Sequence, residues 1–285
     1  MRNVSEPGTL SEASELVGSA GSLSIDREGG EVVLSTVRLN RLLEHEPGDL
    51  TAIVEAGLRL SELQAALAPH GQMLALDPPG DPTIGACLAG DLSGPRRHRF
   101  GAMRDLVLGV TIVLADGTIA SSGGKVVKNV AGYDLGKLFS GSRGRLGLIA
   151  RLALRLHPRP ACTATVVSEG ADPRELWRTL RGSQLAPSAV DFLPPGRLAV
   201  LFEGSSAGVE AQVKACPGEP AEAGVWSESE RRQSEARGRE PFVWQECLLA
   251  RPGVGIAFVA SPVERAWSPL AEAVRASFDP ERVLC

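Results

Sequence analysis

The run from Asp77 to Ile149 is the feature that most restricts how this chain can fold. It holds four blocks rich in glycine and other small residues: Asp77-Pro-Pro-Gly-Asp-Pro-Thr-Ile-Gly-Ala-Cys-Leu-Ala-Gly-Asp-Leu-Ser-Gly94, Arg99-Phe-Gly-Ala-Met-Arg-Asp105, Lys125-Val-Val-Lys-Asn-Val-Ala-Gly-Tyr-Asp-Leu135 and Gly141-Ser-Arg-Gly-Arg-Leu-Gly-Leu-Ile149. An ordinary core would place bulky side chains at such positions, so the backbone here must lie close against something. The blocks favour a large, flat ligand that carries phosphate.

Composition limits the class of protein. The chain has 285 residues, of which 43% are apolar and 22% are charged, so it is globular and long enough for one large domain or two moderate ones. A formal net charge of -4 gives no electrostatic reason to expect nucleic acid or an anionic membrane as partner. No apolar segment approaches the roughly 18 to 20 residues of a membrane span, so we expect a cytoplasmic protein whose membrane association, if any, comes through a partner.

The cysteines and histidines do not indicate a metal site. The five cysteines are spread along the chain without a C-x-x-C pair, which argues against a disulfide framework or a zinc site. The four histidines lack the H-x-x-H or H-x-x-x-H spacing that would place two of them on one helix face. We therefore expect reduced thiols and no metal ion.

Residue patterns predict alternating strands and helices in the first part of the chain. Runs rich in β-branched residues predict strands at 31–39, 51–56 and 106–114, and alternation of apolar residues with Arg151 and Arg155 predicts a strand at 146–156. The tetrapeptide at 115–118, Ala-Asp-Gly-Thr, predicts a hairpin turn into a further strand from Ile119. Apolar spacing of three and four residues predicts a helix over 60–70, with Ser61 as its N-cap.

The character of the chain changes after His157-Pro-Arg-Pro160. This change predicts a domain boundary near residues 157–162. The second part is expected to contain strands at 162–167, 189–192, 198–203 and 255–260, helices at 173–181 and 263–278, and a loop or solvated helix at 227–240. This alternation predicts an α+β fold with a small α+β domain at the end.

The common nucleotide-binding motifs are absent. The chain has no G-x-G-x-x-G, and Gly141-x-x-Gly144-x-x-Gly147 has the wrong spacing for a dinucleotide turn. Gly124 and Lys125 are followed by a valine, so the hydroxyl of a P-loop is missing. What remains is the segment 83–90, which we expect to present consecutive backbone N–H groups as an anion-binding concavity for a pyrophosphate.

The order of these blocks resembles the FAD-binding domain of the vanillyl-alcohol oxidase and para-cresol methylhydroxylase (PCMH) superfamily, and within it the family of FAD-binding subunits of bacterial glycolate oxidase. The resemblance extends from about Leu39 to Pro160 and is most specific over 77–149. It implies a PCMH-type domain of two α/β subdomains at residues 1–160, followed by a reduced, cap-like α+β domain with a C-terminal return segment at residues 161–285.

The resemblance also implies a non-covalently bound FAD. Residues 78–94 would form the main loop against the pyrophosphate and isoalloxazine, residues 99–105 would fix its far end, and the last two blocks would line the opposite wall, with 147–149 on the adenosine side. The cofactor-binding residues implied are Pro78, Gly80, Asp81, Thr83, Ile84, Gly85, Ala86, Cys87, Ala89, Gly90, Ser93, Gly94, Arg99, Gly101, Asn129, Gly132, Tyr133, Asp134, Gly141, Gly144, Gly147, Leu148 and Ile149.

Several of these residues also have a purely structural interpretation. Tyr133, the only tyrosine, is equally well explained as a core residue with a satisfied hydroxyl. Cys87 is better explained as a small buried filler than as a reactive thiol. His98 is more readily a structural histidine than a flavin anchor or base. The catalytic residues therefore stay unassigned.

Two departures from the family pattern bear on function. The resemblance implies a glycine-rich phosphate loop before residue 32, yet residues 23–30 are too short for it and introduce Asp26 and Glu28, whose charge would repel a pyrophosphate. The last residues, 278–285, begin like the family's return strand and stop before its usual Asn-Pro-Gly. Both departures predict a weakened pyrophosphate cradle.

Two functions fit this sequence. The first is an FAD-binding subunit of a glycolate (2-hydroxyacid) oxidase complex, inactive alone, beside a larger homologous flavoprotein subunit and an iron-sulfur subunit. The second is a scaffold of the same kind of complex that has lost its cofactor.

Overall fold

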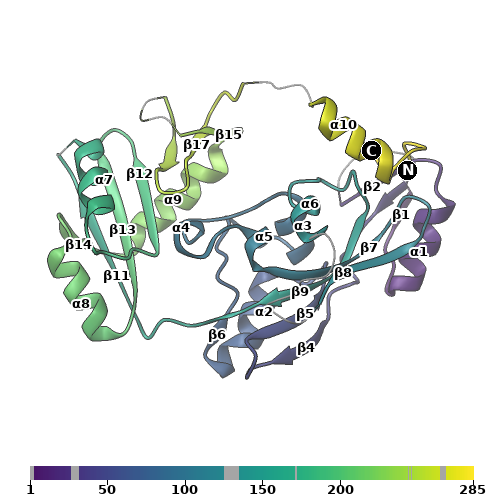
Figure 1. Cartoon of the computed structure of the whole chain (residues 1–285), viewed down its shortest axis with the longest axis horizontal. Helices are drawn as coiled ribbons and strands as arrows, with labels where there is room; N and C mark the ends of the chain where they lie inside the picture. Colours follow the sequence, from purple (N-terminus) through teal and green to yellow (C-terminus); the bar gives the residue numbers. More distant parts are fainter. Residues whose placement is uncertain are drawn as a thin grey trace.

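The computed structural model describes residues 3–26, 32–124, 135–170, 172–242, 244, 246–263 and 268–285. Its elements form a five-stranded sheet with a small parallel sheet beside it, and a separate seven-stranded sheet, as Figure 1 shows. The α+β class expected from the sequence is confirmed.

The chain begins and ends in the small parallel sheet. Strands β1 (Asn3–Ser5) and β2 (Leu23–Ile25) both pair with β3 (Val32–Leu34), and helix α1 (Leu10–Ser19) is capped by the Thr9 hydroxyl. The last residues add to β2, because the Leu23 N–H donates to the Val283 carbonyl at 2.7 Å. Strand β3 is shorter than the predicted strand at 31–39, since the chain turns after Ser35, where the Leu39 N–H donates to the Thr36 carbonyl.

The five-stranded sheet has the order β4-β5-β9-β7-β8 and is antiparallel throughout. Its strands are β4 (Leu42–Glu46), β5 (Thr51–Glu55), β9 (Leu148–Arg155), β7 (Val107–Val113) and β8 (Ile119–Gly123). The predicted hairpin turn at 115–118 joins β7 to β8, and Gly117 adopts a φ of 84° within it. Strand β4 was not predicted.

Short helices cover one face of this sheet. They are α2 (Leu60–Leu67), α3 (Ile84–Ala89), α5 (Met103–Leu106) and α6 (Leu135–Phe139). A 3-10 turn at Ala68–His70 follows α2, and β6 (Gln72–Met73) pairs with β10 (His157–Pro158). Helix α4 (Arg97–Phe100) lies instead against the seven-stranded sheet. Ser61 is not the N-cap of α2: the helix begins one residue earlier, and the Ser61 hydroxyl donates to Asp81 instead.

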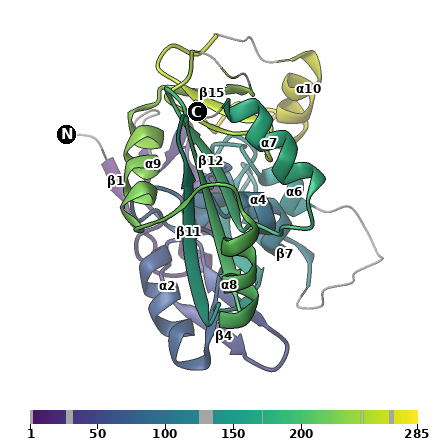
Figure 2. The same ribbon diagram turned by 90° about the vertical axis from the view of Figure 1, so that its left-hand side faces the viewer.

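The seven-stranded sheet has the order β14-β11-β13-β12-β16-β17-β15. Its strands are β11 (Cys162–Ser168), β12 (Ala189–Leu193), β13 (Arg197–Gly204), β14 (Glu219–Ala221), β15 (Gly238–Pro241), β16 (Leu249–Arg251) and β17 (Ile256–Val259). Helices α7 (Pro173–Gly182) and α8 (Ser206–Ala215) lie on one face, and α9 (Gly224–Glu235) lies on the other, as Figure 2 shows. The stretch at 227–240 is thus mostly helix α9 followed by strand β15.

The last helix, α10 (Pro269–Phe278), returns to the five-stranded sheet. Val274 and Phe278 pack against its core, and the Phe139 and Phe278 rings lie 5.9 Å apart. The helix is shorter than the predicted 263–278, because Ser268 caps it and Pro269 occupies its first position. Among the described residues, none of the helices combines the length and the apolar character needed to cross a membrane.

Candidate functional site

Helix α3 forms from the segment that was expected to be an anion-binding concavity. Its first N–H groups have partners within the protein: Ile84 donates to the Leu58 carbonyl, Gly85 donates to the Ala56 carbonyl at 2.7 Å, and Ala86 donates to the Thr83 hydroxyl. The expectation of free N–H groups over 83–90 is therefore wrong. The segment just after strand β5 and the Thr83 hydroxyl supply the acceptors that a phosphate was expected to provide.

Two glycines of this region are required by the protein's own packing. A Cβ atom at Gly85 would lie 2.7 Å from the Cβ of Ala56, well inside van der Waals contact. A Cβ atom at Gly94 would overlap the backbone carbonyl of Asp77. Their small size is explained without a ligand.

A first pocket, which we call the inner pocket, has a volume of about 250 Å³ and lies between α3, the 143–149 segment and residues at the end of β2. The Arg143 N–H donates to the Ala89 carbonyl at 2.9 Å, and the Gly141 N–H donates to the Leu88 carbonyl, which hold this segment against α3. The inner pocket is lined by Ile25, Asp26, Thr36, Ala56, Gly85, Ala86, Ala89, Gly90, Arg143, Gly144, Gly147 and Ile149.

Asp26 and Arg143 are the two charged residues that line the inner pocket. The Asp26 carboxylate accepts hydrogen bonds from the backbone N–H of Thr36 at 2.8 Å and from its hydroxyl at 2.6 Å. The Asp26 carboxylate thus already uses the two Thr36 donors that a bound phosphate could otherwise have used.

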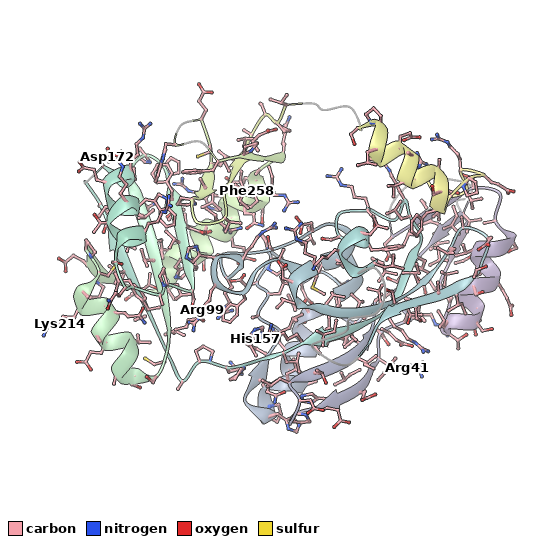
Figure 3. The ribbon with its side chains drawn as sticks, in the orientation of Figure 1. Arg41, Arg99, His157, Asp172, Lys214 and Phe258 are labelled. Carbon is pink, nitrogen blue, oxygen red and sulfur yellow. The ribbon has the colours of Figure 1, made fainter. Side chains whose placement is uncertain are left out.

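A second pocket, the middle pocket, has a volume of about 340 Å³ and shares Gly90 and Arg143 with the first. It is bounded on one side by the segment after α3 and on the other by the end of α9 and strand β15. Its lining residues are Pro78, Pro79, Gly90, Asp91, Leu92, Ser93, Arg143, Gln233, Ala236, Arg237, Gly238, Arg239 and Phe258. Figure 3 shows Phe258 on the side of the seven-stranded sheet that faces the other sheet.

A third pocket, the outer pocket, has a volume of about 470 Å³ and shares Pro78, Pro79 and Gln233 with the second. Its remaining lining residues are Asp77, Pro95, Arg96, Thr163, Ala164, Thr165, Leu201, Glu203, Ala221, Ala223, Trp226, Ser227 and Glu230. Because each pocket shares lining residues with the next, the three pockets adjoin one another in a row, and we refer to this row as the groove.

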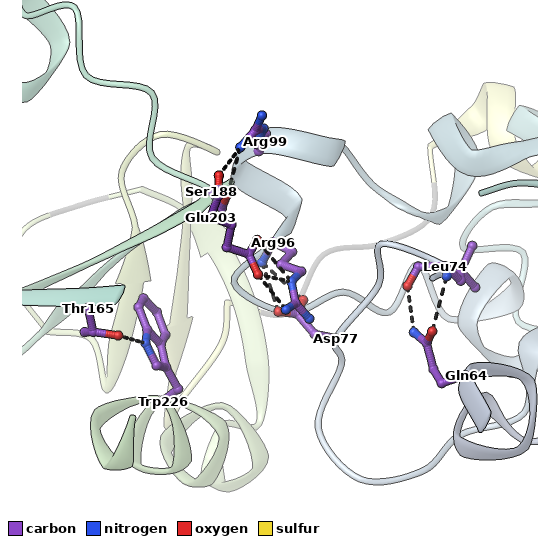
Figure 4. Close-up of polar contacts among 9 residues, drawn as sticks. All are labelled: Gln64, Leu74, Asp77, Arg96, Arg99, Thr165, Ser188, Glu203 and Trp226. Carbon is purple, nitrogen blue, oxygen red and sulfur yellow. Dashed lines mark hydrogen bonds and ion pairs between the residues drawn. The ribbon is translucent and has the colours of Figure 1, made fainter. Parts of the chain in front are cut away.

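The polar groups of the outer pocket are largely paired with one another, as Figure 4 shows. The Arg96 guanidinium donates from Nη2 and Nε to the Glu203 carboxylate, at 2.7 and 3.2 Å from Oε1. The Asp77 carboxylate accepts from the Arg96 backbone N–H, and burial raises the pKa of Asp77 to about 6. The Trp226 indole donates to the Thr165 hydroxyl at 2.9 Å.

The same region joins the two sheets. Arg99 donates to the Ser188 hydroxyl and to the Glu203 carbonyl, and the Gln233 amide donates to the Ser93 carbonyl at 2.8 Å. These contacts connect residues 93–99 to strands and helices far along the chain, so they fix the width of the groove.

The predicted site residues divide into three groups. Those that line the groove are Pro78, Gly85, Ala86, Ala89, Gly90, Ser93, Gly144, Gly147 and Ile149. Those that do not line the three pockets are Gly80, Asp81, Thr83, Ile84, Cys87, Gly94, Arg99, Gly101, Gly141 and Leu148. Asn129, Gly132, Tyr133 and Asp134 lie outside the described residues.

The residues outside the groove have identifiable structural roles. Asp81 accepts from the Ser61 N–H and hydroxyl, the Gly80 N–H donates to Glu230, and the Thr83 hydroxyl caps α3. Cys87 is fully buried, and burial raises the pKa of its thiol to about 12, so the thiol stays protonated and packs as a small apolar side chain. Leu148 packs beside α1, because alternation along β9 turns it away from its neighbour Ile149.

His98 lies against the seven-stranded sheet, with its ring centroid 6.3 Å from that of Trp177. Its Nδ1 atom is buried without a hydrogen-bond partner among the described residues, and desolvation lowers its pKa. His98 does not line the groove.

Sequence reasoning missed the residues that come to the groove from distant segments. They are Ile25, Thr36, Ala56, Arg143, Gln233, Arg237 and Arg239. Arg143 could have been singled out from the sequence, because it stands inside the Gly141-x-x-Gly144 block and the arginine guanidinium suits phosphate.

Comparison with known proteins identifies a family. Residues 12–123 match the family model described as "FAD binding domain". The chain is 33% identical to the glycolate oxidase subunit GlcE of Escherichia coli over 203 residues, which are 69% of this chain and 58% of that protein. It is also 33% identical to the glycolate oxidase subunit GlcD of Bacillus subtilis, over 66% of this chain and 41% of that protein.

Solved structures show the same fold. Alkyldihydroxyacetonephosphate synthase superposes with a TM-score of 0.63 over 75% of this chain and 49% of that chain, at 18% sequence identity. The match to these relatives and to this structure spans about half of their length.

Proposed function

Because the chain belongs to the PCMH-type FAD-binding family, we propose that it is the FAD-binding subunit of a complex that oxidises a small 2-hydroxy acid such as glycolate to the corresponding oxo acid. The observation that carries the proposal is the groove, the row of three adjoining pockets that we call inner, middle and outer. A groove of this extended form suits a dinucleotide better than a compact metabolite.

The residues of the groove fit the chemistry of FAD. The inner pocket is lined largely by glycine and alanine, which let a ring approach the backbone closely. The middle pocket contributes three arginines, which suit phosphate. FAD, when bound, accepts two electrons, and the groove binds it, orients it and shields it from water.

We assign residues 1–160 to the FAD-binding domain and residues 161–285 to a reduced cap domain with a C-terminal return segment. The seven-stranded sheet lies wholly within the second range, and the residues after it pack against the first sheet and strand β2. In this assignment the cap domain forms one wall of the groove.

The proposed complex has a larger homologous flavoprotein subunit and an iron-sulfur subunit, and it works in the cytoplasm. The outer pocket supports a division of labour between subunits, since its wall carries Asp77, Glu203 and Glu230 against one guanidinium, that of Arg96. Arg96 is already paired with Glu203, so an anionic 2-hydroxy acid would meet excess negative charge there and, among the described lining residues, no free cation. Substrate oxidation is therefore assigned to the larger subunit, and this chain holds FAD beside it.

Asp26 favours a second candidate function, a scaffold of the same complex without cofactor. Its carboxylate lines the inner pocket and would repel a phosphate nearby. Ala86 and Ala89, which line the inner pocket, oppose this candidate, because a cleft without a ligand gains nothing from such small side chains at its surface.

An absorption spectrum of the purified chain separates the two candidates. The FAD-binding candidate predicts flavin absorption bands that correspond to about one FAD per chain, either in the protein as purified or after incubation with FAD and gel filtration. If the chain takes up no FAD alone or in the co-purified complex, the flavoprotein assignment is wrong and the scaffold is supported. Co-expression with the two partner subunits, followed by assays with glycolate and D-lactate, then tests the complex and its substrate.

A further inference from the structure

Charge is distributed unevenly along the groove. The inner pocket is lined by one carboxylate and one guanidinium, those of Asp26 and Arg143, and the outer pocket is predominantly acidic. The middle pocket is lined by three arginines, Arg143, Arg237 and Arg239, against a single carboxylate, that of Asp91. A formal charge of about +2 is therefore concentrated at the centre of the groove.

One of these arginines is engaged within the protein. The Arg239 guanidinium donates to the Asp91 carbonyl at 2.9 Å and pairs with its carboxylate at 3.2 Å. The same carboxylate also pairs with Arg97 at 3.2 Å. Asp91 is thus neutralised by two arginines and leaves the remaining charge of the pocket exposed.

The other two arginines have no such partner. Within the part of the chain that the structure describes, the side chains of Arg143 and Arg237 make no hydrogen bond or ion pair, and both are exposed. They come from opposite walls. Arg143 adopts a φ of 53° and is held by its N–H bond to the Ala89 carbonyl, and Arg237 is held at the start of β15 by its N–H bond to the Val259 carbonyl.

We infer that Arg143 and Arg237 form a clamp for the diphosphate of the bound dinucleotide, one from each wall of the middle pocket. The inference rests on the proposed function and deepens it. A diphosphate carries two negative charges, and two guanidinium groups match both that charge and its paired oxygen atoms. The position at the centre of the groove leaves a pocket on each side for the two ends of the dinucleotide.

This clamp differs in origin from a glycine-rich phosphate loop. The first N–H groups of α3 are used within the protein, and Asp26 occupies the donors of Thr36, so neither of these described segments offers a free backbone cradle at the inner end of the groove. Arg237 belongs to the proposed cap domain. The diphosphate would therefore bridge the two domains, and the cap would take part in cofactor binding as well as in covering it.

The test measures binding of three flavins and of inorganic pyrophosphate to the full chain. The variants are Arg143→Gln, Arg237→Gln and the double variant, and the control is Arg178→Gln, which removes one exposed charge from α7 outside the groove. Fluorescence titration gives the affinities for FAD, FMN and riboflavin, calorimetry gives that for pyrophosphate, and circular dichroism verifies that each variant is folded.

Each single variant should weaken FAD binding by about 5- to 10-fold, and the double variant by several tens of fold, because each removes one charge-assisted contact. Riboflavin, which has no phosphate, should bind all variants alike, and the affinity for FAD should fall more steeply with salt in the wild type than in the double variant. Pyrophosphate binding should be lost in the double variant and kept in the control.

Two failures can be told apart. If the wild type binds FAD but the double variant binds FAD and pyrophosphate as tightly as the control, the clamp is refuted and the flavoprotein assignment stands. If the wild type binds pyrophosphate through these arginines but takes up no FAD, the clamp stands as a diphosphate site and the flavoprotein assignment falls.

Discussion

Two neighbouring residues of α3, Gly85 and Ala86, should respond to substitution in opposite ways. In Gly85→Ala the new methyl group would lie 2.7 Å from the Ala56 Cβ and 3.0 Å from the Ala56 carbonyl oxygen. Ordinary carbon contacts are about 3.5 to 4.0 Å, so α3 must move away from β5 by about 1 Å. Such overpacking costs about 1 to 3 kcal/mol, and the better helix propensity of alanine offsets up to about 1 kcal/mol. We expect a net loss of about 1 to 2 kcal/mol in the free energy of unfolding.

Ala86 faces the inner pocket and is partly exposed. In Ala86→Leu the larger side chain extends into a volume of about 250 Å³ and competes with the ligand for it. The free energy of unfolding should change by less than about 0.5 kcal/mol, because no core contact is lost. The affinity for FAD should fall at least about tenfold, since overpacking a binding site costs about 1 kcal/mol or more.

Urea denaturation followed by circular dichroism measures the first effect, and flavin fluorescence titration measures the second. The substitution Ala86→Ser is the matched control, because it barely changes the volume of the side chain. A variant Ala86→Leu that binds FAD as tightly as the wild type would show that the inner pocket is not part of the FAD site. A variant Gly85→Ala of unchanged stability would show that α3 does not pack on β5 as described.

Three further predictions concern charged groups. Arg251 and Asp191 are fully buried and paired at 3.1 Å. Arg251→Met should leave the Asp191 carboxylate without its cation and lower the free energy of unfolding, measured by urea denaturation, by about 3 to 5 kcal/mol. The double variant Arg251→Met with Asp191→Leu should recover much of this loss. Burial raises the pKa of Asp77 to about 6, so the protonated carboxyl contributes stability that is fully present below about pH 4 and is lost as the pH rises through 6. The free energy of unfolding of the wild type should therefore fall by about 2 to 3 kcal/mol more than that of Asp77→Asn over this pH range. Asp26→Asn should strengthen FAD binding several-fold at low salt and less at high salt, because a negative charge leaves the inner pocket; unchanged affinity would refute the repulsion.

Much of the fold followed from local patterns. Strands β5 and β7 were predicted from their β-branched residues, and β9 was predicted from the alternation of apolar residues with arginines. The hairpin turn at 115–118 was predicted from its Asp-Gly pair, and Gly117 adopts the positive φ that such a turn needs. Strand β4 was missed, because Leu42–Glu46 has a leucine pair followed by charged residues and no β-branched residue. It is a strand because it pairs with β5, which local sequence does not reveal.

The glycine-rich run led to the correct family partly for a different reason than expected. Small residues were interpreted as space for a ligand, and Ala86, Ala89 and Gly144 do line the inner pocket. Gly85 and Gly94, however, are small because α3 and the loop after it pack against the protein's own backbone. Sequence cannot separate these causes, since a glycine close to a ligand and a glycine close to a strand look alike along the chain.

The groove depends on contacts that no local pattern encodes. Arg239 pairs with Asp91, the Gln233 amide donates to the Ser93 carbonyl, and both arise from elements more than 130 residues further along the chain. The Arg251 guanidinium in turn donates to the Gln233 carbonyl oxygen at 2.7 Å, which fixes the orientation of that amide. The middle pocket therefore exists only while α9 and β15 stay against the segment after α3. A ligand that contacts both walls must then stabilise this contact by RT ln(1 + L/Kd), where L is the free ligand concentration, so cofactor affinity and the stability of the joint are linked.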